Sequence, residues 1–360
     1  RPARPPRPGL GAGPGRMCPH GPPSVCVPLA EGSGCSLPSG RYRLGAARVG
    51  AVVYVAGGSG PEGDPCPEVL SFNTLSRKLD DRGPEPELQP MPTPRYGHEV
   101  VGVLGRYLLC IGGKAAGSRE SPQCDDEFVG GSAHALDLAT GRWAPLPCRL
   151  AHPRVWFGAA SLATAPAPAA AVVVCGGSAA AALVHNPAEG RLASTELLKV
   201  AALPALFGDA PAAAQGELAW QPGPPLLRPR FDFSLAGPIG GRLYAVGGCG
   251  ARRCVEVLEA TTLLEQLAIG STALPRWELH PVELPADRSG AITVALGSNL
   301  LFLAGSQRSV LCFGPGADDA CPGEASPGLG GGSGAEGALG PNAAWSVLAG
   351  ADLDSARLGA

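Results

Sequence analysis

The run Leu108-Leu109-Cys110-Ile111-Gly112-Gly113, an apolar segment that ends in two glycines, decides how the rest of the chain is interpreted. The same pattern returns at 53–58 (Val-Tyr-Val-Ala-Gly-Gly), at 172–177 and at 243–248, and a degenerate copy at 301–306 ends in Gly-Ser. Such a run is short for a helix and is closed by glycine, which indicates a buried strand. The copies predict five repeat units.

Two further features recur in register with the glycines. Arg95, Arg230 and Arg288 each stand 17 residues before the first glycine of their unit, and Arg154 stands 22 before Gly176. The extra five residues match an insertion at 165–169, whereas the first copy, near Arg41, is one residue short. Tryptophans lie 10 or 11 residues before the last three of these arginines, at positions 143, 220 and 277. Three features in register predict a repeat architecture.

Each unit is expected to hold four short strands. The first follows the arginine, the second is the apolar run into the glycines, and the fourth opens on the tryptophan. The third is a Val/Leu-rich stretch, such as 68–72 or 254–258. A four-stranded sheet of this size cannot bury both faces alone, so the units must stack side by side. The double glycine fits a place where a Cβ would block close backbone approach. Residues 195–206 are expected to form a short helical or irregular insertion in the third unit.

These motifs resemble the kelch repeat, which implies an all-β fold: a β-propeller with four-stranded blades. Five blades are recognisable, and a sixth is expected only if residues 18–40 and 340–360 supply it, with Trp345 opening a strand. The first unit lacks its tryptophan, and Leu88 or Met91 is the nearest apolar substitute. The expected organisation is a Pro/Gly-rich segment (1–37), the propeller (38–320), a Gly-rich linker (321–342) and a C-terminal segment (343–360) that supplies a closing strand.

Composition and charge exclude some function classes. The net charge is −3 and no dense Lys/Arg run is present, which argues against nucleic acid as a partner. The sequence contains no uninterrupted apolar stretch of the length that a membrane span needs, about 18 residues. Of the twelve cysteines, Cys110 and Cys175 lie in apolar strands, which favours reduced thiols in a cytoplasmic protein. Cys249 and Cys254 remain open as a disulfide across a turn.

No catalytic or metal-binding set stands out in the sequence. The six histidines include no two at three- or four-residue spacing, so a local metal pair is absent. The acidic clusters 80–81 and 125–127 are interpreted as solvated loop charge, with a cation or a basic partner as the alternative. We therefore expect no cofactor, no metal and no enzymatic activity.

The resemblance also implies where a partner binds, because in relatives of the ubiquitin-ligase adaptor type, arginines near the Pro-Arg corner grip acidic peptides. The alternative is that a repeated arginine only holds the blades together. Side chains that differ between blades, such as His98, Trp156 and Asp232, are candidates for specificity. The candidate binding residues are Arg43, Arg95, Tyr96, His98, Arg154, Trp156, Arg230, Phe231, Asp232 and Arg288.

The sequence thus predicts a protein-interaction scaffold that binds an unidentified protein or acidic peptide. The alternative is a kelch-based enzyme or enzyme modifier of the copper-oxidase or specifier-protein type.

Overall fold

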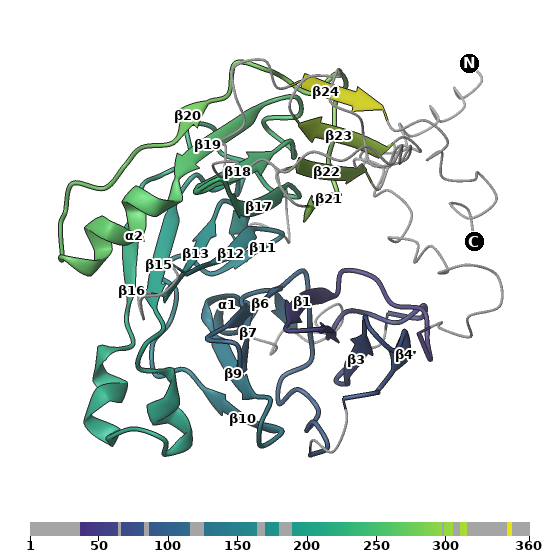
Figure 1. Cartoon of the computed structure of the whole chain (residues 1–360), viewed down its shortest axis with the longest axis vertical. Coiled ribbons are helices and arrows are strands. Elements are labelled where there is room, and N and C mark those ends of the chain that lie inside the picture. Colours follow the sequence, from purple (N-terminus) through teal and green to yellow (C-terminus); the bar gives the residue numbers. More distant parts are fainter. Residues whose placement is uncertain are drawn as a thin grey trace, which may run out of the picture.

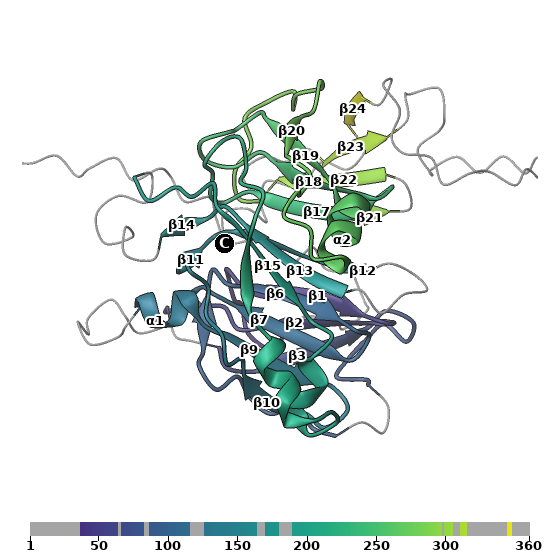
Figure 2. The same ribbon diagram turned by 90° about the vertical axis from the view of Figure 1, so that its left-hand side faces the viewer.

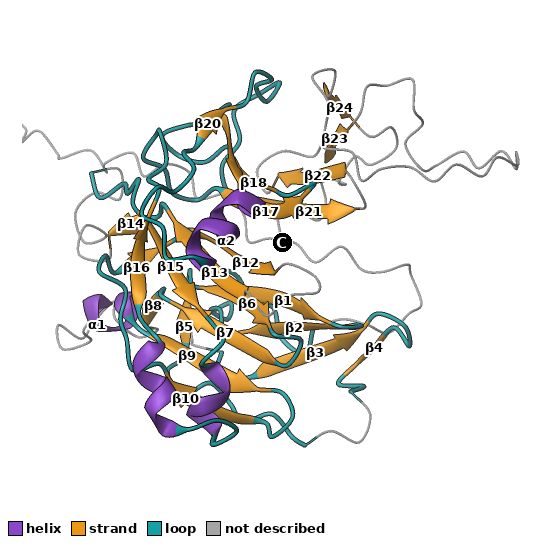
Figure 3. Cartoon of the chain, turned by 60° about the vertical axis from the view of Figure 1, so that its left-hand side comes forward, coloured by secondary structure: helices purple, strands orange, loops and turns teal. Residues whose placement is uncertain are grey.

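The structure of the chain is a computed structural model that describes residues 37–63, 66–82, 86–115, 126–163, 170–179, 189–296, 299–304, 310–314 and 344–347. Short β-strands dominate these residues, and few helices interrupt them (Figure 3). The strands form five four-stranded antiparallel sheets, each built from one continuous section of the chain. The prediction of five four-stranded units is confirmed.

The strands of each sheet, or blade, are as follows. Blade one contains β1 (Gly45–Val49), β2 (Val52–Ala56), β3 (Val69–Asn73) and β4 (Lys78–Leu79). Blade two contains β6 (Glu99–Val103), β7 (Tyr107–Ile111), β9 (Ala133–Asp137) and β10 (Arg142–Pro145). Blade three contains β12 (Gly158–Ala163), β13 (Ala170–Cys175), β15 (Thr195–Lys199) and β16 (Trp220–Gly223). Blade four contains β17 (Ser234–Ile239), β18 (Arg242–Val246), β19 (Val255–Glu259) and β20 (Glu278–Leu279). Blade five contains β21 (Ala291–Leu296), β22 (Asn299–Ala304), β23 (Val310–Gly314) and β24 (Ala344–Val347).

The blades follow one another around a common axis, in chain order from purple to yellow in Figure 1. The first strand of each blade is its inner strand and contacts the inner strand of the next: β1 with β6, β6 with β12, β12 with β17, and β17 with β21. Within each blade the chain then steps outward, strand by strand, to the periphery. This arrangement defines the fold as a β-propeller.

The hydrophobic core lies between neighbouring blades. Along β13, Val172 and Val174 pack in the cluster shared with blade two, whereas Val173 and Cys175 pack in the cluster shared with blade four. Because side chains alternate between the two faces of a strand, a strand covered on both faces must be apolar at every position. This explains why the runs that end in the glycine pairs show no polar alternation.

The tryptophans of the outer strands anchor the connections between blades. Trp143 of blade two donates from Nε1 to the carbonyl of Gln89, in the segment that arrives from blade one. Trp277, directly before β20, does the same to Pro224, in the segment that arrives from blade three. In blade one Met91 is buried and Leu88 is half-buried, both in the cluster between blades one and two.

The connections between third and fourth strands carry helices in blades three and four. Helix α2 (Ala260–Ala268) of blade four packs on β12 of blade three. In blade three, two 3₁₀ helices, η2 (Leu203–Phe207) and η3 (Ala212–Glu217), pack toward blade two, where the rings of Phe207 and Tyr107 stack at 5.5 Å. The expectation of an irregular insertion over 195–206 was therefore wrong for its first half, because 195–199 is the central strand β15.

Blade two carries the short helix α1 (Asp126–Gly131). In blades two and three, a small two-stranded sheet pairs the segment that enters the blade with the segment that follows its glycine pair. These two-stranded pieces are β5 (Arg95–Tyr96) with β8 (Lys114–Ala115), and β11 (Arg154–Val155) with β14 (Ser178–Ala179). Seen from the side, α1, β11 and β14 lie toward one end of the propeller and α2 toward the other (Figure 2). The end with the two-stranded pieces is called the arginine end below.

The C-terminal expectations are partly revised. Trp345 does lie in a strand, but that strand, β24, is the fourth of blade five, so the propeller extends to residue 347. The described residues contain no sixth four-stranded sheet, and residues 18–36 and 348–360 lie outside them, as does the linker over 321–342. None of the helices within the described ranges is long and apolar enough to span a membrane.

Candidate functional site

In each of the first four units, the arginine that opens the unit lies inside its own blade and binds the first glycine of that blade's pair. Nη1 of Arg95, Arg154 and Arg230 donates to the carbonyls of Gly112, Gly176 and Gly247 at 2.9 to 3.0 Å. Arg41 makes the equivalent bond to Gly57 at 3.4 Å and is therefore the counterpart in blade one. This repeated bond is the physical reason for the fixed spacing between arginine and glycine. These residues, with Arg288 of blade five, are called the corner arginines.

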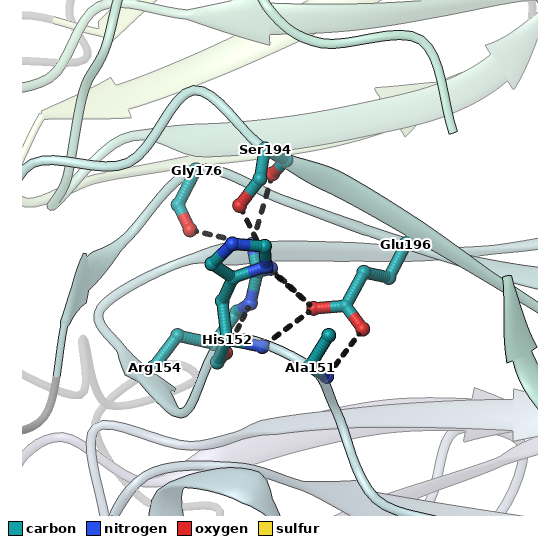
Figure 4. Close-up of polar contacts among 6 residues, drawn as sticks. All are labelled: Ala151, His152, Arg154, Gly176, Ser194 and Glu196. Carbon is teal, nitrogen blue, oxygen red and sulfur yellow. Dashed lines mark hydrogen bonds and ion pairs between the residues drawn. The ribbon is translucent and has the colours of Figure 1, made fainter. Parts of the chain in front are cut away.

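Blades three and four add a buried carboxylate to this arrangement. In blade three, Nη2 of Arg154 lies 2.6 Å from Oε1 of Glu196, and the carboxylate also accepts from the backbone amides of Ala151 and His152 (Figure 4). In blade four, Arg230 pairs with Glu256, which accepts from the amides at 227 and 228. A buried carboxylate satisfied by a guanidinium and two amides fixes the connection between blades.

Blade two replaces the carboxylate with a histidine. Nη2 of Arg95 lies 3.2 Å from Nδ1 of His134, which occupies the strand position of Glu196 and Glu256. Burial, and secondly the charge of Arg95, lower the pKa of His134 to about 4. At neutral pH the ring is uncharged and its Nδ1 accepts from the guanidinium.

The glycine pairs join each blade to the next. The second glycine donates its N–H to the backbone carbonyl of the next corner arginine, as Gly113 does to Arg154 and Gly177 to Arg230. Both glycines of each pair have positive φ, and a Cβ on Gly112 would stand 2.9 Å from the Arg154 carbonyl oxygen. The expectation that close backbone approach requires these glycines is confirmed.

These contacts bear on the two roles considered for the corner arginines. Arg95, Arg154 and Arg230 are 0% exposed, and Arg288 is 3% exposed. Their burial inside the blades favours the structural role over the binding of a partner. The acidic-peptide interpretation, which relied on a ring of guanidiniums, finds no support in the positions of these four residues.

The residue two positions after each corner arginine forms a second repeat, which we call the corner residues. They are Arg43, Gly97, Trp156, Asp232 and Gly290, and all five have φ between 52 and 64°. From the second member on, each N–H donates to the carbonyl of the preceding member at 2.9 Å, so one line of four hydrogen bonds crosses blades one to five. The corner residues stand directly before the inner strands, at the arginine end of the axis.

Three corner residues carry side chains, and these gather with a neighbouring aromatic. The guanidinium of Arg43 lies 4.5 Å from the centre of the Trp156 ring, and the rings of Trp156 and Phe231 lie 5.9 Å apart. The Trp156 indole covers Gly97, whose Cβ position lies 2.9 Å from it. The Asp232 carboxylate lies next to Gly290. All of these side chains are half-buried, so they reach the surface of the arginine end.

The two remaining candidate residues, Tyr96 and His98, differ in their exposure. Tyr96 is half-buried and pairs with Lys114, so it lies at the same end. His98 is buried beside Gly45 and Gly57 of blade one, and burial, with the charge of Arg95, lowers its pKa to about 3. The position of His98 makes it part of the interface between blades one and two and not a surface residue.

Sequence reasoning missed the carboxylates of Glu196 and Glu256. Each was visible as one acidic residue inside a short apolar strand, Thr-Glu-Leu-Leu and Val-Glu-Val-Leu. Buried charges are paired in folded proteins, so this signal pointed to a partner such as the corner arginine. The sequence also did not separate Arg41 from Arg43, which differ here in burial and role.

The acidic cluster 80–81 and the described cysteines show no site chemistry, and the acidic side chains of 125–127 lie outside what the structure describes. Asp80 accepts from the N–H and hydroxyl of Ser71, and no group of three potential metal ligands occurs in the described part of the chain. No disulfide joins Cys249 to Cys254 in the structure, so the disulfide alternative does not apply.

Comparison with known proteins adds no family to this description: no protein-family model matches the chain, and no curated protein is significantly similar to it.

Proposed function

We propose that this propeller is a kelch-type, non-catalytic scaffold that binds a protein partner through the side chains of the arginine end. The observation that carries the proposal is the contrast among the corner residues. All five share one backbone conformation, yet two are glycine and three are Arg43, Trp156 and Asp232. Glycine adopts positive φ without strain, whereas a bulky residue there costs about 1 kcal/mol or more.

The contrast with glycine is largest at Trp156, the bulkiest of the corner residues. A half-buried tryptophan in a left-handed conformation is not required by the backbone, because Gly97 and Gly290 make the same hydrogen bonds. Tryptophan, tyrosine and arginine are the residues that most often dominate binding energy at protein interfaces. Strained residues at exposed positions also concentrate at binding sites. The partner is therefore expected to cover Trp156, Phe231 and Arg43.

Trp156→Gly tests the proposal without disturbing the fold. The variant gives blade three the residue that blades two and five already have, so its melting temperature should stay within a few degrees of the parent. Affinity capture from a cell extract should lose its specific partner.

Leu104→Gly is the matched control, because Leu104 is also a part-exposed apolar residue with positive φ, but in the turn between β6 and β7 at the opposite end. This variant should capture the partner normally. Equal capture by the parent and both variants, with all three folded, would count against the proposal.

We also propose a reducing compartment, the cytoplasm, for this protein. None of the six cysteines in the described residues is in a disulfide, and four of them, including Cys110 and Cys175, are buried. Titration of all twelve cysteines as thiols after denaturation without reductant would support this assignment, and disulfides found in the freshly isolated protein would oppose it.

A further inference from the structure

In blades one to four, the first residue of the inner strand faces the inner strand of the next blade. Gly45 of blade one lies against Val100 of blade two, and Gly158 of blade three lies against Leu235 of blade four. Both contacts are so close that neither glycine has room for a Cβ. At these two interfaces a glycine therefore makes space for a large side chain of the next blade.

The corresponding residue of blade two is Glu99, which has no such counterpart. It lies on the same face of β6 as Val101, toward blade three, and the residue opposite is the small Ala159. The corresponding polar residue of blade four, Ser234, is hydrogen-bonded to the hydroxyl of Thr293 in blade five. Glu99 makes no hydrogen bond or ion pair with the described residues. At this interface alone among the four, a carboxyl group faces a methyl group.

A carboxyl without a partner is held in its neutral form at this place. Burial raises the pKa of Glu99 to about 8, since no cation or donor beside it favours the charged form. The pKa of His98 is lowered to about 3 by burial, and burial raises the pKa of the Cys110 and Cys175 thiols to about 11 and 12. Arg95 is bonded inside its own blade, and β12 contributes no ionisable residue. Among the described groups around it, only Glu99 changes its charge between pH 6 and 8.

Aromatic side chains stand beside Glu99 at the arginine end. The Trp156 indole covers Gly97, two residues before Glu99, and the Phe231 ring lies 5.9 Å from the indole. The guanidinium of Arg43 lies on this indole and is not paired with Glu99, so the ring accepts a cation. A half-buried carboxyl below an aromatic rim suits a long basic side chain, whose apolar stem packs on the rings and whose charged head meets the acid. A metal ion would need further ligands, and the part of the chain that the structure describes holds no group of three.

We infer that the arginine end binds a basic side chain of the partner protein, which passes Trp156 and forms an ion pair with Glu99. The pair forms only when Glu99 gives up its proton, so each bound partner releases a proton to the solvent. Affinity therefore rises with pH, because only the ionised fraction of Glu99 is competent to bind. The inference rests on the proposed function and adds the chemistry of the ligand.

Two rhodamine-labelled peptides with blocked termini test the inference by fluorescence anisotropy on the full chain. They are Ser-Leu-Arg-Leu-Ser and the same sequence with citrulline, which keeps the shape of arginine and lacks its charge. The arginine peptide should bind about tenfold more tightly than the citrulline peptide at pH 8. Its affinity should rise about fiftyfold from pH 6 to pH 8, because the ionised fraction of a carboxyl with a pKa of about 8 grows from about 1% to about one half. The affinity of the citrulline peptide should not rise in this way.

Glu99→Gln is the test variant, because glutamine resembles the neutral acid and cannot ionise. In this variant the two peptides should bind alike, with no change in affinity between pH 6 and pH 8. Equal affinity of the two peptides for the parent, no binding by either, or a pH dependence that Glu99→Gln retains would each overturn the inference. If it fails in this way while Trp156→Gly still abolishes capture, the scaffold function stands and only the ligand chemistry is wrong. Thermal unfolding of each variant checks that the fold is retained.

Discussion

Arg154 and Glu196 form an ion pair of 2.6 Å with both side chains almost fully buried, and the same carboxylate accepts two backbone amides from the connection that enters blade three. One carboxylate thus neutralises the corner arginine and also accepts hydrogen bonds from two backbone N–H groups. The arginine in turn binds the carbonyls of Gly176 and Ser194. The pair links the entry to the blade, its second strand and its third strand in one network.

Glu196→Ala is expected to destabilise the protein by about 3 to 5 kcal/mol, because it leaves a buried guanidinium without its counter-charge. Urea unfolding followed by circular dichroism measures the change. The control is Glu259→Ala, since Arg242 and Glu259 are also 2.6 Å apart but are one-third to one-half exposed. That exposed pair should contribute about 1 kcal/mol or less. A similar loss in both variants would show that burial does not govern the Glu196 network.

Gly112→Ala is expected to cost more than about 2 kcal/mol, because the new methyl group meets the Arg154 carbonyl oxygen and the Phe157 ring at 2.7 to 2.9 Å while φ is +62°. Gly105→Ala is the matched control. Gly105 has φ of +64° but no atom within 4 Å of its Cβ position, so only backbone strain of about 1 kcal/mol applies. Equal melting temperatures for the two variants would contradict the role of close approach at the glycine pair.

The sequence was sufficient for the blades and insufficient for the site. The spacing of Arg95 to Gly112 reflects one hydrogen bond that blades one to four repeat, so it was readable without a structure. The corner residues were not readable as a set, because their shared property is a backbone conformation and not a residue type. Nor does spacing alone reveal burial: Arg41 and Arg43 are two residues apart, and only the structure shows that the first binds Gly57 and the second stacks on Trp156.

His134 is expected to make stability fall with acidification. Its pKa is near 6.5 in the unfolded chain and about 4 in the fold, so the unfolded state takes up a proton first as pH drops below 6.5. Its contribution is constant above pH 7 and is lost between about pH 6.5 and 4, on the order of 2 kcal/mol for a partly buried ring. His134→Gln keeps an acceptor for Arg95 and cannot titrate. Between pH 7 and pH 4.5 the parent should therefore lose more stability than the variant. Urea titrations of both proteins at the two pH values measure this difference.

Glu99, at the start of the inner strand β6, is expected to act in the opposite pH range. Removal from bulk water raises the pKa of its carboxyl to about 8, whereas the unfolded chain keeps a value near 4.5. The folded state therefore holds a proton that the unfolded state releases, and stability is lost as pH rises from 4.5 through 8. Glu99→Gln resembles the protonated acid in shape and hydrogen bonding, so it should leave stability unchanged at pH 4.5 and increase it at pH 9. His134→Gln serves as the reference for ordinary alkaline effects, because neutral His134 does not titrate there. If the Glu99→Gln variant loses stability between pH 4.5 and 9 as steeply as the parent, the prediction is wrong. The Glu99 carboxylate would then be in contact with water or a cation in the folded state.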